Sequence, residues 1–112
     1  MKARNDIIYR KGDRMTRGII MEHNPLMSFN NGLEITYSDL KRDQEKEYIV
    51  LYFEKPNEEK NGFDSAKFIF PGTEFSEVQG FTKQDLDEMM IHVNKTGPLA
   101  FEFSKEDAEA KV

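Results

Sequence analysis

Residues 48–53 are Tyr-Ile-Val-Leu-Tyr-Phe, an unbroken run of apolar and aromatic side chains with charged residues on both sides. The β-branched and aromatic content of this run favours a strand over a helix of similar length. A continuous apolar run is typical of a strand covered on both faces, so we expect it near the middle of a sheet. The rest of the chain must then supply the elements that cover this strand.

The composition indicates a small intracellular protein. A chain of 112 residues fits one domain with a modest core, for which nine Phe and four Tyr supply large apolar surfaces. The chain has no cysteine, which excludes a disulfide framework, a thiolate zinc site and a cysteine nucleophile. No apolar run approaches the ~20 residues of a membrane span, and the first residues carry no hydrophobic segment of a signal peptide. We therefore expect a soluble, cytoplasmic protein.

The segments before the central run predict further strands. Residues 7–21 have the pattern of a hairpin with a basic, glycine-containing tip. Asn24-Pro25 should end the second of these strands, and a loop should follow to about Gly32. Residues 33–37 alternate apolar and polar side chains, as a half-exposed strand does. Residues 38–46 are a short, charged connection or a single helical turn, so residues 33–37 should lie antiparallel to the central strand.

The segments after the central run predict a loop, a strand and a turn. Residues 56–64 are the most polar stretch and should form a loop leading to a strand over residues 66–70. Pro71-Gly72 fits the central positions of a type II turn, which would end that strand. Residues 73–80 fit either a strand or a helical turn.

A capping pattern predicts the start of a helix at Thr82. Thr82 is followed three residues later by Asp85, and Phe81 and Leu86 occupy the positions of a hydrophobic staple. An apolar stripe with helical spacing then follows, formed by Leu86, Met89, Met90 and Val93. Gly97-Pro98 should stop the helix, so we expect it over about residues 82–95, with a last strand over residues 99–103.

This order of elements predicts an α+β fold, with a mostly antiparallel sheet of about five or six strands and one main helix packed on one face. One helix cannot cover both faces of such a sheet. The other face should be closed by strand curvature, by a loop such as residues 25–29, or by a second copy of the protein.

The sequence contains no strong signature of catalysis, of a metal or of a cofactor. The two histidines, His23 and His92, have no recognisable nucleophile or second ligand nearby, so we assign neither to chemistry. Asn57, Glu59 and Asn61 mimic the first half of a calcium loop, but Phe68 stands where the closing acid is needed. The glycines are scattered singly, which is unlike a phosphate-binding loop. We expect a protein that is not an enzyme and that binds no cofactor.

The net charge of −5 conceals an asymmetry along the chain. Residues 1–17 carry six basic side chains against two acidic ones, a balance of +4. Residues 54–112 carry seven lysines against thirteen carboxylates, a balance of −6. Such a division steers encounters with charged partners, although in many soluble proteins it serves only solubility.

Two binding hypotheses follow from this asymmetry. In the first, an acidic surface engages a basic protein partner, in the way that small phage and mobile-element inhibitors such as anti-CRISPR proteins do; this analogy rests on size and charge. The candidate residues are Glu58, Glu59, Asp64, Asp85, Asp87 and Glu88, with Glu54, Glu74 and Glu77 on the same half of the chain.

In the second hypothesis, the basic hairpin binds nucleic acid through cations that meet phosphates and an aromatic ring that stacks on a base. Its candidate residues are Tyr9, Arg10, Lys11, Arg14 and Arg17. A homo-oligomeric accessory protein that closes its open sheet face with a second copy is a further alternative.

Overall fold

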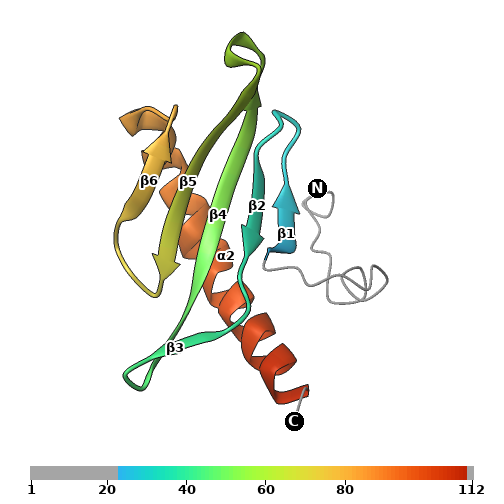
Figure 1. Cartoon of the computed structure of the whole chain (residues 1–112), viewed down its shortest axis with the longest axis vertical. Helices are drawn as coiled ribbons and strands as arrows, with labels where there is room; N and C mark the ends of the chain where they lie inside the picture. Colours follow the sequence, from blue (N-terminus) through green and yellow to red (C-terminus); the bar gives the residue numbers. More distant parts are fainter. Residues whose placement is uncertain (1–22, 111–112) are drawn as a thin grey trace.

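The computed structural model describes residues 23–110, which form a six-stranded antiparallel sheet and one long helix (Figure 1). The α+β prediction is therefore confirmed. The predicted hairpin over residues 7–21 lies outside the described residues. In chain order the elements are β1 (Asn24–Ser28), β2 (Glu34–Tyr37), β3 (Lys41–Asp43), β4 (Lys46–Asn57), the 3-10 helix η2 (Glu58–Lys60), β5 (Gly62–Phe70), β6 (Phe75–Gln79) and α2 (Lys83–Ala110).

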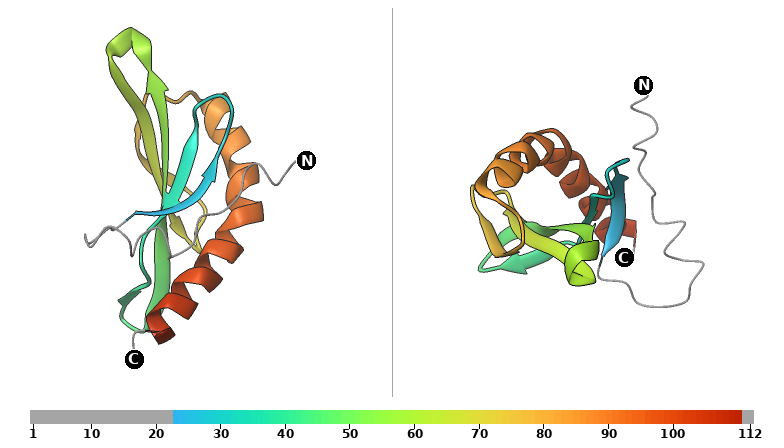
Figure 2. Two further views of the ribbon diagram at one scale, coloured as in Figure 1. Left: turned by 90° about the vertical axis from the view of Figure 1, so that its right-hand side faces the viewer. Right: turned by 90° about the horizontal axis from the view of Figure 1, so that it is seen from above.

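Strand β4 is the centre of the sheet, as its apolar run predicted. The strand order is β1-β2-β4-β5-β6, and β3 pairs with the first residues of β4. The prediction that β2 and β4 are antiparallel neighbours is confirmed. Figure 2 shows α2 running along one side of the curved sheet.

Only one face of β4 is fully buried, so the expectation of burial on both faces is wrong. Ile49, Leu51 and Phe53 are fully buried, whereas the alternate residues Tyr48 to Tyr52 are half-buried. The reason is that α2 covers the inner face of the sheet alone. The remaining buried apolar residues of this core are Leu26, Leu33, Ile35, Tyr37, Ala66, Phe68, Met89, Val93 and Ala100.

Asn24-Pro25 begins a strand instead of ending one. Strand β1 pairs antiparallel with β2, with a register shift between Pro25 and Met27. Proline is tolerated here because β1 is an edge strand, where a missing N–H breaks no central ladder. The predicted loop is thus reduced to the short connection between β1 and β2.

The charged connection before the central strand contains the short strand β3. Gln44 and Glu45 form a two-residue turn to β4, and both have positive φ, of 53° and 72°. Positive φ at both positions is the geometry of the tight turns that match strand twist. Because this turn lacks the usual Asn-Gly or Asp-Gly sequence, the pattern did not indicate a hairpin.

The polar segment over residues 56–64 is mostly strand, not loop. The ladder between β4 and β5 continues through Pro56 opposite Phe63 to Asn57 opposite Gly62. Only η2 and Asn61 leave it, and Asn61 adopts the left-handed conformation that closes the turn. Strong polarity here reflects solvent exposure of a protruding hairpin and not a lack of strand pairing.

The turn after β5 ends that strand as expected, but it is not a type II turn. Gly72 does not have the positive φ that a type II turn requires at this position. The glycine is needed for a different reason, since a Cβ at Gly72 would overlap the carbonyl oxygen of Ile69. The Phe70–Pro71 peptide bond is cis. The segment that was ambiguous from sequence is the edge strand β6.

The predicted start of the helix is confirmed by its hydrogen bonds. The Asp85 backbone N–H donates to Oγ1 of Thr82 at 3.1 Å, and the Thr82 N–H donates to Oδ2 of Asp85 at 2.8 Å. These reciprocal bonds form a capping box, here with Asp in the place of Glu. Within the predicted stripe, Met89 and Val93 are fully buried, while Leu86 and Met90 are half-buried.

The helix does not stop at Gly97-Pro98, and the predicted strand over residues 99–103 is its continuation. Residues with helical spacing stay buried along its second half, namely Thr96, Gly97, Ala100, Ser104 and Asp107. A proline normally clashes with the Cβ of a preceding helical residue, but Gly97 has none. The missing N–H of Pro98 leaves the Asn94 carbonyl without its helical partner on a turn where both residues are exposed to water.

Replacing Gly97 with Ala should lower the stability of the protein. Alanine favours the helix by about 1 kcal/mol over glycine. A Cβ at this position, however, would lie 2.5 Å from the Phe70 ring, which itself packs edge-on against Phe101. Because overpacking typically costs ~1–3 kcal/mol, we expect a net loss of stability in chemical unfolding.

The Phe70→Leu background is the control for this prediction. Without the ring, Gly97→Ala should become neutral or stabilising relative to Phe70→Leu alone. An equal loss of stability in both backgrounds would show that contact with Phe70 is not the reason for the glycine.

Candidate functional site

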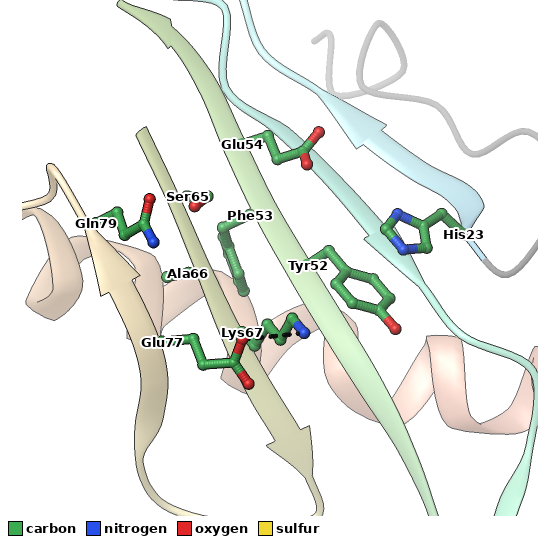
Figure 3. A pocket seen from close by; sticks show the side chains of 9 residues that line it. All are labelled: His23, Tyr52, Phe53, Glu54, Ser65, Ala66, Lys67, Glu77 and Gln79. Atoms are coloured by element: carbon green, nitrogen blue, oxygen red, sulfur yellow. Dashed lines mark ion pairs between the residues drawn. The ribbon is translucent and has the colours of Figure 1, made fainter. Parts of the chain in front are cut away.

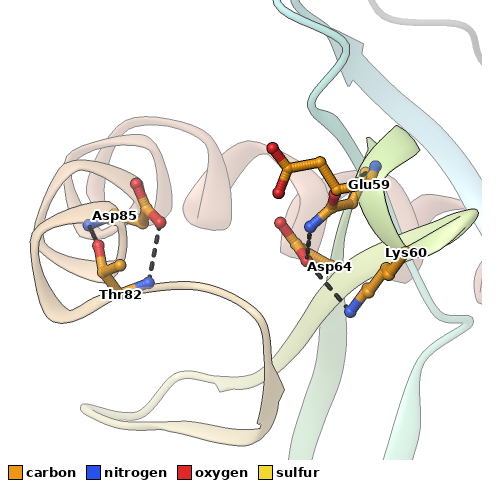
Figure 4. Close-up of polar contacts among 6 residues, drawn as sticks. Glu59, Lys60, Asp64, Thr82 and Asp85 are labelled. Atoms are coloured by element: carbon orange, nitrogen blue, oxygen red, sulfur yellow. Dashed lines mark hydrogen bonds and ion pairs between the residues drawn. The ribbon is translucent and has the colours of Figure 1, made fainter.

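The acidic residues singled out from sequence lie on two elements at one end of the molecule. Glu58 and Glu59 form the tip of the β4–β5 hairpin, and Asp85, Asp87 and Glu88 lie in the first turns of α2. Figure 4 shows the polar contacts of Lys60 and Asp64 in the hairpin and of Thr82 and Asp85 at the start of the helix, and Figure 1 shows both elements toward the same end of the molecule. We call this region the acidic end, and it consists of Glu58, Glu59, Asp64, Asp85, Asp87 and Glu88.

Asp64 joins the hairpin to the segment that leads into the helix. Its Oδ1 accepts a hydrogen bond from the Asn57 side chain at 3.0 Å and lies 3.2 Å from Nζ of Lys60. The backbone of Gly80 passes so close that a Cβ there would overlap the Asp64 carboxylate. Gly80 also has a φ of +91°, a conformation that side chains other than glycine rarely adopt. Asp64 is therefore a structural carboxylate.

The surroundings of Asp64 stabilise its charged form. The hydrogen bond from Asn57 is the largest influence that lowers the pKa of the Asp64 carboxyl, and Lys60 and Lys55 lower it further. Partial burial acts in the opposite direction but does not prevail. Asp64 thus remains ionised to lower pH than an isolated aspartate.

Two of the three helix acids also have partners within the chain. Asp85 is held in the capping box with Thr82, and Asp87 pairs with Lys83 at 3.2 Å on an exposed surface. Glu58, Glu59 and Glu88 are exposed, and no cation of the described residues lies within ion-pair distance of them. These three carboxylates are the part of the acidic end that is available to a partner.

A hollow of about 140 Å³ lies beside the first turns of α2. Lys55 of β4 lines it together with Asp85 and Glu88 of α2. Its floor is apolar and aromatic, formed by Phe29, Leu33, Phe81 and Met89. His92 closes one side with its ring 4.6 Å from that of Phe29, so this histidine has an aromatic neighbour that the sequence did not reveal.

The described part of the chain is more acidic than the whole. Residues 23–110 contain nine lysines and arginines against eighteen aspartates and glutamates, a balance of −9. The basic residues of the alternative hypothesis, Tyr9 to Arg17, lie outside the described residues. The acidic balance of residues 23–110 favours cationic partners, and the basic residues 1–17 offset part of it, so the whole chain has a net charge of −5.

The outer face of the sheet, opposite α2, holds a second hollow of about 250 Å³ (Figure 3). The His23 ring stacks on Tyr52 with 3.7 Å between centroids, and Lys67 pairs with Glu77 at 3.2 Å. Ser65 lies in the same hollow, but no hydrogen bond joins it to His23. These groups line a polar surface without the nucleophile and base contact that acyl transfer needs.

In the segment that resembles half of a calcium loop, the Asn57 side chain binds a backbone N–H group. Oδ1 of Asn57 accepts a hydrogen bond from the Glu59 N–H at 3.1 Å, which caps η2. Across residues 23–110 there is no cluster of three or more His, Cys, Asp or Glu able to hold a metal ion. Nor does this part of the chain contain a helix whose length and apolar character would allow it to cross a membrane.

Comparisons of the chain with protein-family models, with curated proteins and with solved structures give no match.

Replacing Asp64 with Asn should remove a stabilising effect that depends on pH. Because the folded-state pKa is lowered, the contribution of Asp64 is complete above the unfolded value of about 3.9 and is lost as pH falls through the folded value. The gap in unfolding free energy between the wild type and Asp64→Asn should thus be widest near neutral pH and should narrow in acid. Chemical unfolding from pH 7 to 2 measures this gap.

Glu45→Gln, which changes an exposed carboxylate in the β3–β4 turn, is the control variant. A gap for Asp64→Asn that does not vary with pH would contradict the assigned role of the carboxylate.

Proposed function

We propose that this chain is a non-enzymatic binding protein whose acidic end engages a basic protein partner. The observation that carries the proposal is that Glu58, Glu59 and Glu88 are exposed and form no ion pair with a cation of residues 23–110. Carboxylates without intramolecular cations retain their full attraction for a cationic surface. The partner would be a cytoplasmic protein whose basic surface also binds nucleic acid, and occupation of that surface would make this chain an inhibitor.

The hydrogen bonds and ion pairs within the acidic end support this proposal. The capping box fixes the start of α2, and the Asp64 contacts with Asn57 and Lys60 fix the hairpin tip. Because these contacts order the backbone that carries the carboxylates, the backbone loses little conformational freedom when a partner docks, which favours binding. The small hollow beside the first turns of α2 is lined by apolar side chains and by two carboxylates, Asp85 and Glu88, against one cation, Lys55, so its charge balance favours a cationic side chain such as arginine.

Neutralising Glu58, Glu59 and Glu88, which form no ion pair within residues 23–110, should slow association with the partner. We expect the variant Glu58→Gln, Glu59→Gln, Glu88→Gln to recover a basic protein from lysate less efficiently than the wild type does. In kinetics with that purified protein, the association rate should fall about tenfold at low salt, because exposed charges act mainly on encounter. Asp85 is left unchanged because it caps the helix.

The matched control is Glu45→Gln, Glu102→Gln, Glu109→Gln, which removes three exposed carboxylates from the β3–β4 turn and the distal part of α2. This variant has the same net charge and should bind nearly as the wild type does. Equal weakening by both triple variants would show that net charge alone acts, and recovery of no basic protein would contradict the proposal.

We also expect no appreciable affinity for DNA or RNA at physiological salt, since the domain repels a polyanion. Fluorescence anisotropy with labelled DNA and RNA tests this expectation. Salt-dependent binding that disappears in the variant Arg10→Gln, Lys11→Gln, Arg14→Gln would instead support the nucleic-acid-binding alternative.

A further inference from the structure

The chain contains two Asn-Gly pairs, one in the connection between β1 and β2 and one between η2 and β5, namely Asn31-Gly32 and Asn61-Gly62. An asparagine followed by glycine can lose its side-chain amide, because glycine has no side chain to hinder attack by its own backbone nitrogen on the asparagine side-chain carbonyl. The attack needs freedom of the asparagine backbone and side chain. The two pairs differ in how firmly the fold holds these groups.

The pair Asn31-Gly32 is held by hydrogen bonds at both reacting groups. The Gly32 backbone N–H donates to the Phe29 carbonyl at 2.9 Å, and Oδ1 of Asn31 accepts a hydrogen bond from the Leu33 N–H at 3.0 Å. The fold also requires the glycine, since Gly32 has a φ of +96° and a Cβ there would lie 3.2 Å from Cδ of Pro56. Turn geometry therefore accounts for this pair and restrains it.

The pair Asn61-Gly62 lies at the exposed tip of the β4–β5 hairpin and is not restrained in this way. Asn61 has the left-handed conformation that asparagine tolerates at such a cap. Its side chain is exposed, and none of the hydrogen bonds among residues 23–110 involves it. Gly62 has no positive φ, and a Cβ there would meet only the Lys60 carbonyl oxygen at an ordinary 3.8 Å. The fold thus explains the asparagine but gives no reason for the glycine.

From this contrast we propose that Asn61-Gly62 is a site of spontaneous deamidation, which adds a carboxylate to the acidic end. The Gly62 backbone nitrogen, after loss of its proton to solvent, forms a bond to Cγ of Asn61. The Cγ–Nδ2 bond breaks, and the amide group leaves as ammonia after taking up a proton. Water then opens the cyclic imide, which gives aspartate when it adds at Cγ and isoaspartate when it adds at the backbone carbonyl carbon. The net reaction exchanges ammonia for water and needs no oxidant.

The hairpin tip can supply the motion that the attack requires. The ψ of Asn61 is 43°, so it must rotate to bring the Gly62 nitrogen against Cγ, and the turn must open locally. The pair of Asn57 with Gly62 is the last of the β4–β5 ladder, and η2 contains no buried residue. Segments with few buried contacts open at the smallest cost in free energy.

The reaction would change the charge of the surface that carries Glu58 and Glu59. Each conversion adds one negative charge to the same hairpin tip, where both glutamates are exposed. Isoaspartate also lengthens the main chain within the turn, because the chain then passes through Cγ. The reaction depends only on the chain and water, so it does not rest on the proposed function.

Peptide mapping by mass spectrometry of the aged full-length protein tests the site. The protein is incubated at mildly alkaline pH, and the mass increase that accompanies exchange of an amide for an acid is followed at both pairs. We expect Asn61 to convert about tenfold faster than Asn31, because local opening is easier at the hairpin tip. In urea, where the fold is lost, the two pairs should convert at similar rates.

Conversion of Asn31 as fast as Asn61 in the folded protein would overturn the proposal. Retention of the Asn61 amide in the folded protein, while the chain in urea reacts, would overturn it as well.

Gly62→Ala is the matched variant, because a Cβ fits at this position and the protein should remain folded. The added methyl group hinders attack by the backbone nitrogen, so conversion at Asn61 should slow about tenfold. Asn31 in the same molecule is the internal control and should react as in the wild type. Circular dichroism would verify the fold, and undiminished conversion at Asn61 in this variant would contradict attack by the Gly62 nitrogen.

Discussion

The packing of α2 against the inner face of β4 and β5 is the interaction on which the rest of the structure depends. Ile49, Leu51 and Phe53 on β4 and Phe68 on β5 are fully buried beneath the helix side of the sheet. Such burial contributes on the order of 1.5–3 kcal/mol for each large side chain. Since one long helix supplies this cover, the sheet curves around it, and the helix must be long enough to follow the central strand (Figure 2).

The close approach of α2 to the sheet sets the requirement for glycine at position 97. Gly97 lies against the Phe70 ring, and no other residue would fit there without displacing the ring. The same glycine makes room for Pro98 within the helix. Packing with the sheet thus explains why a Gly-Pro pair, which usually marks a helix end, lies in the middle of this one.

The packing of α2 on the inner face of the sheet leaves two surfaces exposed outside the core. At one end, the hairpin tip and the helix start are held by Asp64, Gly80 and the capping box, so that Glu58, Glu59 and Glu88 project from rigid supports. On the outer face, β4 presents its alternate side chains away from α2. The outer face is exposed because the one described helix covers the other face of the sheet, whereas the acidic end is held by local contacts of the hairpin and of the helix start.

Local interactions allowed the sequence by itself to determine three features of this protein. The run over residues 48–53 predicted the central strand, Thr82 with Asp85 predicted the start of the helix, and the excess of carboxylates predicted an acidic domain. The sequence also identified the candidate residues that form the acidic end. It did not reveal that Asp64 and Asp87 pair with Lys60 and Lys83, because those ion pairs depend on the geometry of the hairpin turn and of the first turn of the helix.

Contacts between residues distant in sequence determined the features of the fold that the sequence pattern did not predict. The helix continues past Pro98 because residues 70 and 97 meet, and Pro25 lies in a strand because that strand is at the edge of the sheet. Lys46 and Glu54 lie on the same face of β4, and the pairing of β4 with its neighbours determines that this face points away from the core. Each of these outcomes depends on a neighbour far away in sequence, to which local periodicity and turn propensity do not respond.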